Sequence, residues 1–227
     1  MPPASQVQNI FTRIAPRYDL MNRLMTGGQD VGWRRMVIAL ARLSAGDRML
    51  DLGAGTGDLA REALRQQPEC LVTAADFTLA MMLIGIRRVG RQMDWSAADA
   101  LNLPFASASQ DAIVSGFLLR NVASIDQALR EQLRVLKPGG RWVALDTTRP
   151  RRSWLSPLIH FYMHHVIPLL GGLLTGQRDA YTYLPETSES FLRAEELAAR
   201  MAAAGFKKIG FHRLNFGTVA IHWGEKA

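Results

Sequence analysis

Three glycines separated by single residues follow an apolar run and precede a helical pattern, at Gly53, Gly55 and Gly57. Because glycine has no Cβ, such a turn can adopt positive φ and bring backbone N–H groups close to a ligand. Thr56 lies within the turn, and Asp51 places a carboxylate beside it, where it can attract the ammonium of a cofactor that carries an amino acid. The segment predicts a nucleotide-type cofactor site.

Residues 55–60 also fit the G-x-G-x-x-A form of a dinucleotide fingerprint, so two cofactor classes remain open. The next two apolar runs end in Asp76, suited to a ribose diol, and in Asp99, suited to an adenine amino group. We include the neighbouring Phe77 and Ala100 in the predicted site. Three strand-end carboxylates would repel a pyrophosphate, which favours S-adenosylmethionine, with its ammonium, ribose and adenine, as the cofactor.

Composition is typical of a single enzyme domain. The chain has 227 residues, of which 48% are hydrophobic, enough to bury a full core. Its one cysteine, Cys70, lies in an apolar run and predicts a core residue rather than a disulfide or a cysteine-based metal site. The first residues lack the basic head and apolar core of a signal peptide, so we expect a cytoplasmic location.

The net charge of +7 raises the question of a nucleic acid or an anionic membrane as partner. Basic residues are densest at 149–152, directly before the apolar segment 154–174. This pattern fits a peripheral contact with the inner face of a membrane, or a solvated loop. Two prolines and three histidines argue against a membrane span, and we expect an apolar lid that receives a polyprenyl tail, or a plain core-covering helix pair.

Metal binding is not expected. The three histidines of the apolar segment have helical spacing but no acidic or cysteine partner at ligand spacing; they are His160, His164 and His165.

Strand-like and helix-like segments alternate through the middle of the chain. Strands are predicted at 48–52, 71–75, 93–97, 112–117 and 141–146, and helices at 59–66, 81–89 and 124–136, the last stopped by a turn at 137–140. This βαβ series predicts an α/β fold with a doubly wound, mostly parallel sheet. A helix at 195–204 precedes strands at 207–214 and 217–223, which a short turn forces to pair antiparallel.

The chain is predicted to form one domain with four parts. Residues 1–44 form a helical leader or lid, with helices at 9–24 and 33–43. Residues 45–149 form the cofactor-binding core, residues 150–190 an apolar substrate lid, and residues 191–227 a closing helix and β-hairpin.

Several motifs together resemble the ubiquinone/menaquinone biosynthesis C-methyltransferases, a demethylmenaquinone methyltransferase-like, class I family. They are the glycine turn 50–58, Tyr-Asp-Leu-Met-Asn at 18–22, Leu-Arg-Asn-Val at 119–122, and Arg-Val-Leu-Lys-Pro-Gly-Gly at 134–140. The likeness covers nearly the whole chain. It implies a seven-stranded, Rossmann-like sheet with one antiparallel strand, and methyl transfer from S-adenosylmethionine to a ring carbon of a prenylated quinol in menaquinone or ubiquinone biosynthesis.

That reaction needs an electron-rich carbon, which exists only when the neighbouring hydroxyl is ionised or shares its proton with a base. Arg120, which matches the family motif, is suited to stabilise the developing oxyanion, and Asn121 to orient it. Tyr18 or Asp19 could take part from the leader. The proton acceptor stays open among Asp19, Asp30, Tyr181 and a bound water.

Three departures from the family pattern concern the site. Asp30 stands nearest the position of a family histidine, so it must serve instead of that histidine or the substrate differs. Gly116 replaces a serine that contacts the cofactor, and a backbone contact could survive the change. The family's Leu-Glu-Phe-Ser becomes Leu-Asp-Thr-Thr at 145–148.

Other functions stay open at this point. The same cofactor half would serve a methyltransferase of another small phenolic, terpenoid or sterol substrate. An RNA methyltransferase is disfavoured because the chain lacks an Asn-Pro-Pro-Tyr type of motif and a basic stripe interleaved with aromatics, so no nucleic-acid partner is expected. A non-catalytic S-adenosylmethionine-binding protein is a third candidate. A homodimer is compatible with all of them.

Overall fold

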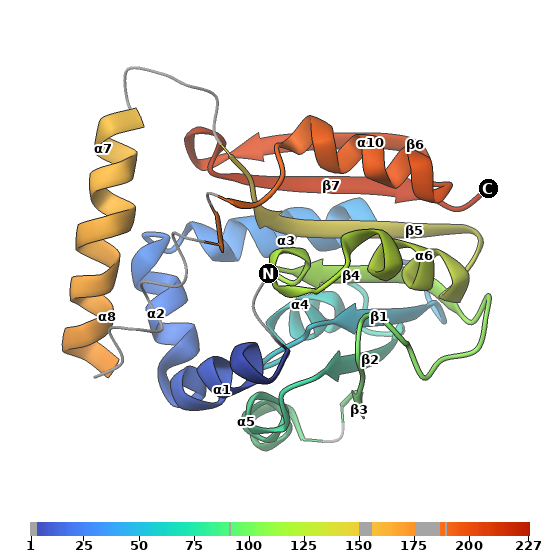
Figure 1. Ribbon diagram of the computed structural model, residues 1–227. Helices are drawn as coiled ribbons and strands as arrows, with labels where there is room; N and C mark the ends of the chain where they lie inside the picture. Colours follow the sequence, from blue (N-terminus) through green and yellow to red (C-terminus); the bar gives the residue numbers. More distant parts are fainter. Residues whose placement is uncertain (1–3, 91, 150–155, 176–186, 189) are drawn as a thin grey trace.

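The computed structural model describes residues 4–90, 92–149, 156–175, 187–188 and 190–227. Within these residues, seven strands form one sheet in the order β3-β2-β1-β4-β5-β7-β6 (Figure 1). Their bounds are β1 Arg48–Leu52, β2 Leu71–Asp76, β3 Asp94–Ala97, β4 Gln110–Gly116, β5 Leu136–Thr147, β6 Lys207–Leu214 and β7 Val219–Glu225. All the expected strands are present.

The sheet is parallel except for one strand. β1 pairs in parallel with β2 and with β4, β2 pairs in parallel with β3, and β4 with β5. β7 runs antiparallel to both of its neighbours, β5 and β6. The expected doubly wound, Rossmann-like sheet is therefore confirmed. From β1, the next two strands are added on one side of the sheet and β4 on the other side, so the strand order reverses between β1 and β4. Ligands of such folds bind at this switch point, outside the carboxyl ends of the strands.

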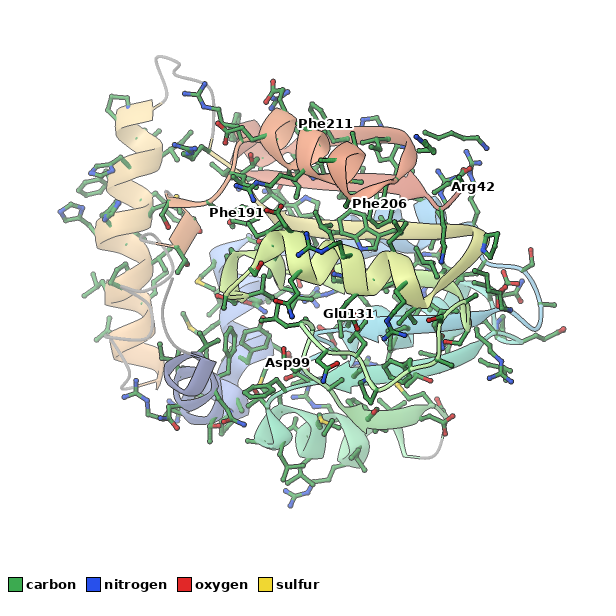
Figure 2. All side chains as sticks on the ribbon, turned by 45° about the vertical axis from the view of Figure 1, so that its right-hand side comes forward. Arg42, Asp99, Glu131, Phe191, Phe206 and Phe211 are labelled. Atoms are coloured by element: carbon green, nitrogen blue, oxygen red, sulfur yellow. The ribbon has the colours of Figure 1, made fainter. Side chains whose placement is uncertain are left out.

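Helices cover both faces of the sheet. On one face lie α3 Gln29–Ala41, α4 Asp58–Gln66 and α5 Leu79–Val89; on the other lie α6 Ile125–Val135 and α10 Ala194–Ala204. The Ser124 hydroxyl caps α6 by accepting from Gln127 N at 3.3 Å, and α10 ends at Gly205 with φ +110°. Phe191 and Phe206 fill the core beside α6 and α10 (Figure 2).

The N-terminal leader is two helices rather than the single helix expected at 9–24. α1 spans Ala4–Ile14, a 3₁₀ turn occupies Ala15–Arg17, and α2 spans Tyr18–Met25. Pro16 explains the break, because proline has no backbone N–H for a helical hydrogen bond. The bend lets α1 pack beside α5 while α2 continues toward α3.

Two further segments refine the expectations. Residues 137–140 do not precede the strand but lie inside β5, where the register against β4 shifts between Gln110 and Ala112. The described part of the apolar segment is helical and stands at one end of the sheet: α7 Ser156–Phe161, a π-helical turn Tyr162–Val166, and α8 Ile167–Thr175 (Figure 1). None of the helices in the described ranges is long and apolar enough to cross a membrane.

Candidate active site

Three cavities meet at the carboxyl ends of the central strands. The strand-end cavity, about 140 Å³, follows the ends of β1, β2 and β4. The glycine-turn cavity, about 40 Å³, lies beside residues 53–56. The apolar cavity, about 580 Å³, is bounded by α2, α3 and the helical segment 158–167. Phe117 lines all three, so the three cavities are neighbours around this residue.

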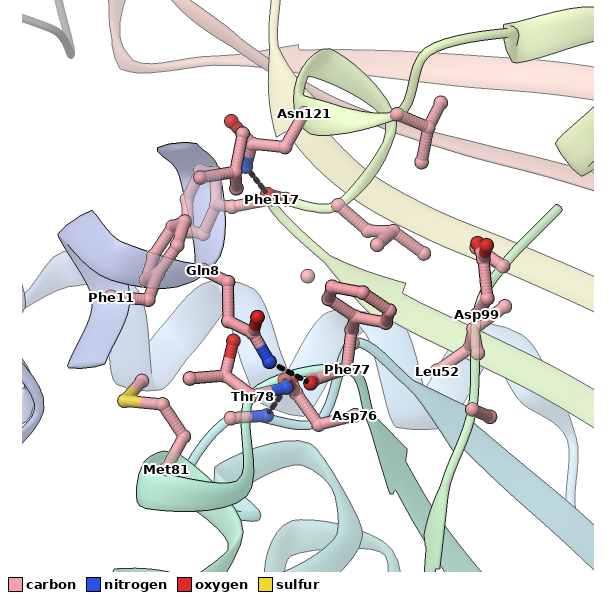
Figure 3. Close-up of a pocket in the computed structure, with 18 of the residues that line it drawn as sticks. Gln8, Phe11, Leu52, Asp76, Phe77, Thr78, Met81, Asp99, Phe117 and Asn121 are labelled. Atoms are coloured by element: carbon pink, nitrogen blue, oxygen red, sulfur yellow. Dashed lines mark hydrogen bonds between the residues drawn. The ribbon is translucent and has the colours of Figure 1, made fainter. Parts of the chain in front are cut away.

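The strand-end cavity contains most of the predicted nucleoside site. Asp76, Phe77, Asp99, Ala100 and Gly116 all line it. The Asp76 carboxylate accepts from Gly55 N at 2.7 Å and from Thr78 N at 2.6 Å (Figure 3). These bonds hold the carboxylate at the end of β2, although burial raises its pKa above the ordinary value.

Helix α1 covers this cavity, a contribution that sequence reasoning missed. The Gln8 side-chain amide donates to the Phe77 carbonyl at 3.0 Å, and Phe11 lies beside it (Figure 3). Nothing in the residue types of the leader marks these two positions. A helical lid was expected here, and its contact residues follow only from the fold.

Asp51 provides a buried and half-satisfied carboxylate in the glycine-turn cavity. Asp51 is only 1% exposed. Its Oδ2 accepts a hydrogen bond from Ala60 N at 3.0 Å, whereas its Oδ1 has no hydrogen-bond partner among the described residues. Burial raises the pKa of Asp51 to about 7. An unpartnered buried acceptor is costly, and a ligand ammonium would satisfy it. The Asp51 carboxylate therefore fits the ammonium at the amino-acid end of S-adenosylmethionine.

The glycine turn has two different reasons for its residue types. Gly53 and Gly55 line the cavities with φ of +70° and +58°, and a Cβ on Gly53 would lie 2.9 Å from the Leu118 side chain. Gly57 lines none of the three cavities; a Cβ there would lie 2.9 Å from the Trp95 ring. Gly57 therefore packs against Trp95, and its contact with the cofactor stays a prediction.

Thr56 and Asp19 meet each other instead of facing a reaction centre. Thr56 borders the glycine-turn cavity, and its hydroxyl donates to Asp19 Oδ1 at 2.7 Å. The other Asp19 oxygen forms an ion pair with Arg88 of α5. Asp19 lines none of the three cavities. Asp19 therefore links α2 to the glycine turn and to α5. Because both of its oxygens are engaged in this way, it does not suit the role of proton acceptor.

Tyr18 and Asn121 lie on the cofactor side of the region. Tyr18 lines the strand-end and glycine-turn cavities, and burial raises the pKa of its phenol. At neutral pH it is therefore a donor rather than a base. Asn121 lines the strand-end cavity, and its amide donates to the Phe117 carbonyl at 2.9 Å. Asn121 thus faces the predicted cofactor, and only Arg120 of this pair lines the apolar cavity.

Arg120 is buried and aimed at the apolar cavity. Its Nη1 lies 3.6 Å from Asp146 Oδ1, and its guanidinium carbon lies 4.9 Å from the centre of the Phe117 ring. Phe117 has φ +58°, which is rare for a bulky residue and typical of functional sites. Burial raises the pKa of Asp146, against the lowering effect of Arg120. From the sequence, Phe117 was expected only as the end of a strand. The cofactor contact was predicted for the preceding residue, Gly116.

Unpartnered polar atoms gather on the apolar cavity. Three buried atoms that make no hydrogen bond among the described residues belong to side chains that line it: Arg120 Nη1, Thr147 Oγ1 and Ser188 Oγ. The rest of the wall is largely apolar and includes Trp33, Phe161 and Ile167. Such a cavity fits an apolar ligand that carries a few oxygen atoms, because bound oxygens would satisfy the orphaned donors.

Asp30 does not have the free carboxylate that a substitute for the family histidine would need. It is 2% exposed; Oδ2 forms an ion pair with Arg34, and Oδ1 accepts from Thr26 Oγ1 at 3.2 Å and lies 3.4 Å from Arg23 Nε. Tyr181, the other candidate acceptor, lies outside the described residues. Among the described residues, no group of three or more His, Cys, Asp or Glu could hold a metal ion.

The fold and the cavities define the class of protein. A solved structure of the [4+2]-cyclase SpnF superimposes with a TM-score of 0.73 at 18% identity, covering 99% of this chain and 97% of that chain. At this identity the likeness shows the fold alone. The class that the fold defines is therefore a doubly wound α/β protein whose glycine turn and acids lie at the carboxyl ends of parallel strands.

Sequence comparisons narrow the class. A family model described as the ubiE/COQ5 methyltransferase family matches residues 3–226. The chain is 43% identical over 221 residues to the "Ubiquinone/menaquinone biosynthesis C-methyltransferase UbiE" of Desulfotalea psychrophila, covering 97% of this chain and 90% of the relative. It is 44% identical over 220 residues to the "Demethylmenaquinone methyltransferase" of Thermus thermophilus, covering 96% and 100%. The chain belongs to the ubiE/COQ5 methyltransferase family, and it is an S-adenosylmethionine-dependent methyltransferase.

Proposed function

We propose that this enzyme methylates a ring carbon of a prenylated quinol, demethylmenaquinol or a close relative, in menaquinone or ubiquinone biosynthesis. The names of the two relatives support the substrate class. The observation that carries the proposal is the apolar cavity of about 580 Å³, which Arg120 lines; its Nη1 makes no hydrogen bond among the described residues and lies 3.6 Å from Asp146 Oδ1. An aromatic ring with an ionisable hydroxyl and an apolar tail matches this combination of a long apolar wall and one buried cation.

The cofactor lies across the two smaller cavities in this proposal. Asp76 receives the ribose, Asp99 and Ala100 border the adenine, and Asp51 receives the ammonium. Gly53, Gly55 and Gly116 keep the walls open for close backbone approach. S-adenosylmethionine supplies a methyl group that is activated by its sulfonium. Because Phe117 borders all three cavities, the activated methyl group and the ring can meet beside it.

Arg120 controls the ring hydroxyl. Its guanidinium lies in a buried setting, where a positive charge favours ionisation of a nearby phenol. The ionised oxygen would raise the electron density at the neighbouring ring carbon. S-adenosylmethionine would supply the methyl group with loss of its carbon–sulfur bond, S-adenosylhomocysteine would leave, and the hydrogen of the methylated ring carbon would be lost as a proton, which restores the aromatic ring. Asp30, the carboxylate that the described residues place on this cavity wall, is already engaged by Arg34, so we propose that a water accepts the hydroxyl proton. Thr147 and Ser188 offer hydroxyls to the ring oxygens.

The apolar outer surface near this cavity supports a peripheral membrane contact, which would give access to a lipid-soluble substrate. Large apolar side chains are exposed on the helices α7 and α8 and at the turn before β7: Leu158 by 65%, Phe161 by 55%, Leu169 by 55%, Leu173 by 74% and Phe216 by 76%. Leu158, Phe161 and Phe216 also line the cavity. A prenyl tail could therefore pass from the membrane surface directly into the site.

A substrate panel tests the proposal. Transfer of labelled methyl groups would be measured with demethylmenaquinol, with the same ring without a tail, and with catechol as a soluble phenol. We expect the prenylated quinol to have the highest kcat/KM, and liposomes to raise it further. If catechol or another soluble phenol were the better substrate, the proposed substrate would be wrong and a small soluble phenol would replace it.

A further inference from the structure

Arg34 lies in the glycine-turn cavity but has no assigned role. It projects from α3, and its side chain is only 14% exposed. Its Nη1 is paired with Asp30, and its Nη2 lies 3.1 Å from Asp58 Oδ2. A guanidinium has five N–H donors in a fixed fork, and these two contacts use one N–H of Nη1 and one N–H of Nη2. Arg34 therefore has donors left for a ligand and is held in place by two carboxylates.

The same cavity contains a buried acceptor and a buried donor. Asp51 Oδ1 is the acceptor, and it has no hydrogen-bond partner among the described residues. Asn22 Nδ2 is the donor; the Asn22 side chain hydrogen-bonds the Tyr18 phenol, and an amide has a second N–H for a ligand. Both residues line the glycine-turn cavity together with Arg34. The amino-acid end of S-adenosylmethionine carries an ammonium and a carboxylate on one carbon. The cavity thus offers one group of the correct sign for each of them.

We propose that Arg34 and Asn22 bind the carboxylate of the methionyl end of S-adenosylmethionine, opposite the ammonium held by Asp51. This inference rests on S-adenosylmethionine being the cofactor, but not on the identity of the methyl acceptor. Asp30 and Asp58 act as positioning residues, because they fix the guanidinium fork from both sides. Asp30 also lines the apolar cavity, so one ion pair connects the two cavities.

The proposal explains why an acid stands at the position of the family histidine. Asp30 and Arg34 are separated by one helical turn on α3, so the carboxylate supports the arginine that the cofactor meets. In this chain Asp30 positions Arg34 and does not accept a proton from the substrate.

Ligand binding without any acceptor tests this assignment. Calorimetry would compare S-adenosylhomocysteine, which has both charged groups, with its decarboxylated analogue, which keeps only the ammonium. We expect the wild-type enzyme to bind the decarboxylated analogue about 10- to 100-fold more weakly, the range for a charged hydrogen-bonded contact. In Arg34→Met the two ligands should bind within about threefold of each other. Asn22→Leu should lose part of the discrimination, and Arg34→Lys should keep most of it.

Arg61→Met is the matched control. Arg61 also pairs with Asp58, at 3.2 Å, but it does not line the glycine-turn cavity and its side chain is 51% exposed. It should keep the full discrimination between the two ligands. If the wild-type enzyme failed to discriminate, or if Arg34→Met weakened both ligands equally and kept their ratio, Arg34 would be an ion-pair bridge only. Binding with the expected ratio but no transfer to quinols would overturn the proposed substrate and leave this assignment intact.

Discussion

The strand-end cavity and the apolar cavity are built in opposite ways. In the first, the polar groups come from neighbouring strand ends and are mostly held by backbone amides, as Asp76 is held by Gly55 and Thr78. In the second, the polar groups come from segments far apart in the chain, and several have no partner, such as Thr147 Oγ1 and Ser188 Oγ. The cofactor side is therefore preorganised within one βαβ framework, whereas on the substrate side the unpartnered hydroxyls gain hydrogen bonds only when a ligand with oxygen atoms is bound.

Removing the buried cation should produce the largest effect. In Arg120→Met we expect kcat to fall about 10²- to 10³-fold, as for the loss of one charge-stabilising donor. S-adenosylhomocysteine affinity should stay within about twofold, because Arg120 lines only the apolar cavity. The double variant with Asp146→Asn controls for the buried carboxylate that the single change leaves unpaired. Weakened cofactor binding in both variants would show that the two regions are not separable.

On the cofactor side, Asp51→Asn should weaken binding of S-adenosylhomocysteine about 10- to 100-fold, because a neutral amide replaces the charge that the ammonium needs. Calorimetry measures this change directly. Asp51→Glu, which keeps the charge, serves as the control. Unchanged affinity in the asparagine variant would remove the ammonium from this position.

The same residue predicts a pH dependence. The folded pKa of Asp51 is about 7, above its ordinary value of 3.8, so the ligand-free folded state holds this proton more tightly than the unfolded state does. Asp51 therefore lowers the stability of the ligand-free fold as pH rises from about 4 through 7. A bound ammonium favours the ionised form, so ligand binding below pH 7 should release a proton, measured in buffers of different ionisation enthalpy. Asp51→Asn should abolish that release.

The substrate side should show a trade-off between stability and activity. Thr147→Val and Ser188→Ala remove hydroxyls that lack partners, so each should raise the unfolding temperature of the ligand-free enzyme. Each should also lower kcat/KM for the quinol about five- to tenfold, the equivalent of one neutral hydrogen bond. A stabilised variant with full activity would show that the hydroxyl does not contact the substrate.

The smallest effect on kcat is expected for Asp19, which links α2 to the glycine turn and to α5. Asp19→Asn weakens the link to Thr56 and Arg88, so we expect kcat to change less than about threefold, while loss of a true general base would cost about 10²- to 10⁴-fold. Arg88→Met, which breaks the same link from α5, should reproduce the result. A large loss confined to Asp19→Asn would return Asp19 to the list of proton acceptors.

The difference between the two regions also decides what the sequence can predict. The glycine turn, Asp51, Asp76 and Asp99 follow directly after strands, and parallel strand ends meet at one edge, so local patterns were enough to bring them together. The apolar cavity offers no such pattern. The role of Phe117 depends on a positive φ, and the position of Arg34 depends on how α3 packs against α4.

Two sequence interpretations changed for physical reasons. Asn121 and Arg120 are adjacent in the chain, but the 3₁₀ turn Leu119–Asn121 points them into different cavities. Asp19 and Tyr18 are also adjacent, and the start of α2 directs them to different neighbours. Adjacent residues on a helical turn do not share a face, which motif spacing alone does not reveal.

The most direct measurement follows ¹³C-methyl transfer from S-adenosylmethionine to demethylmenaquinol and to the oxidised quinone, side by side. The product would be assigned by NMR. We predict a new methyl group on a ring carbon of the reduced substrate, no product from the quinone, and loss of the product in Arg120→Met. Methylation of a ring oxygen, or equal transfer to the oxidised quinone, would contradict this prediction.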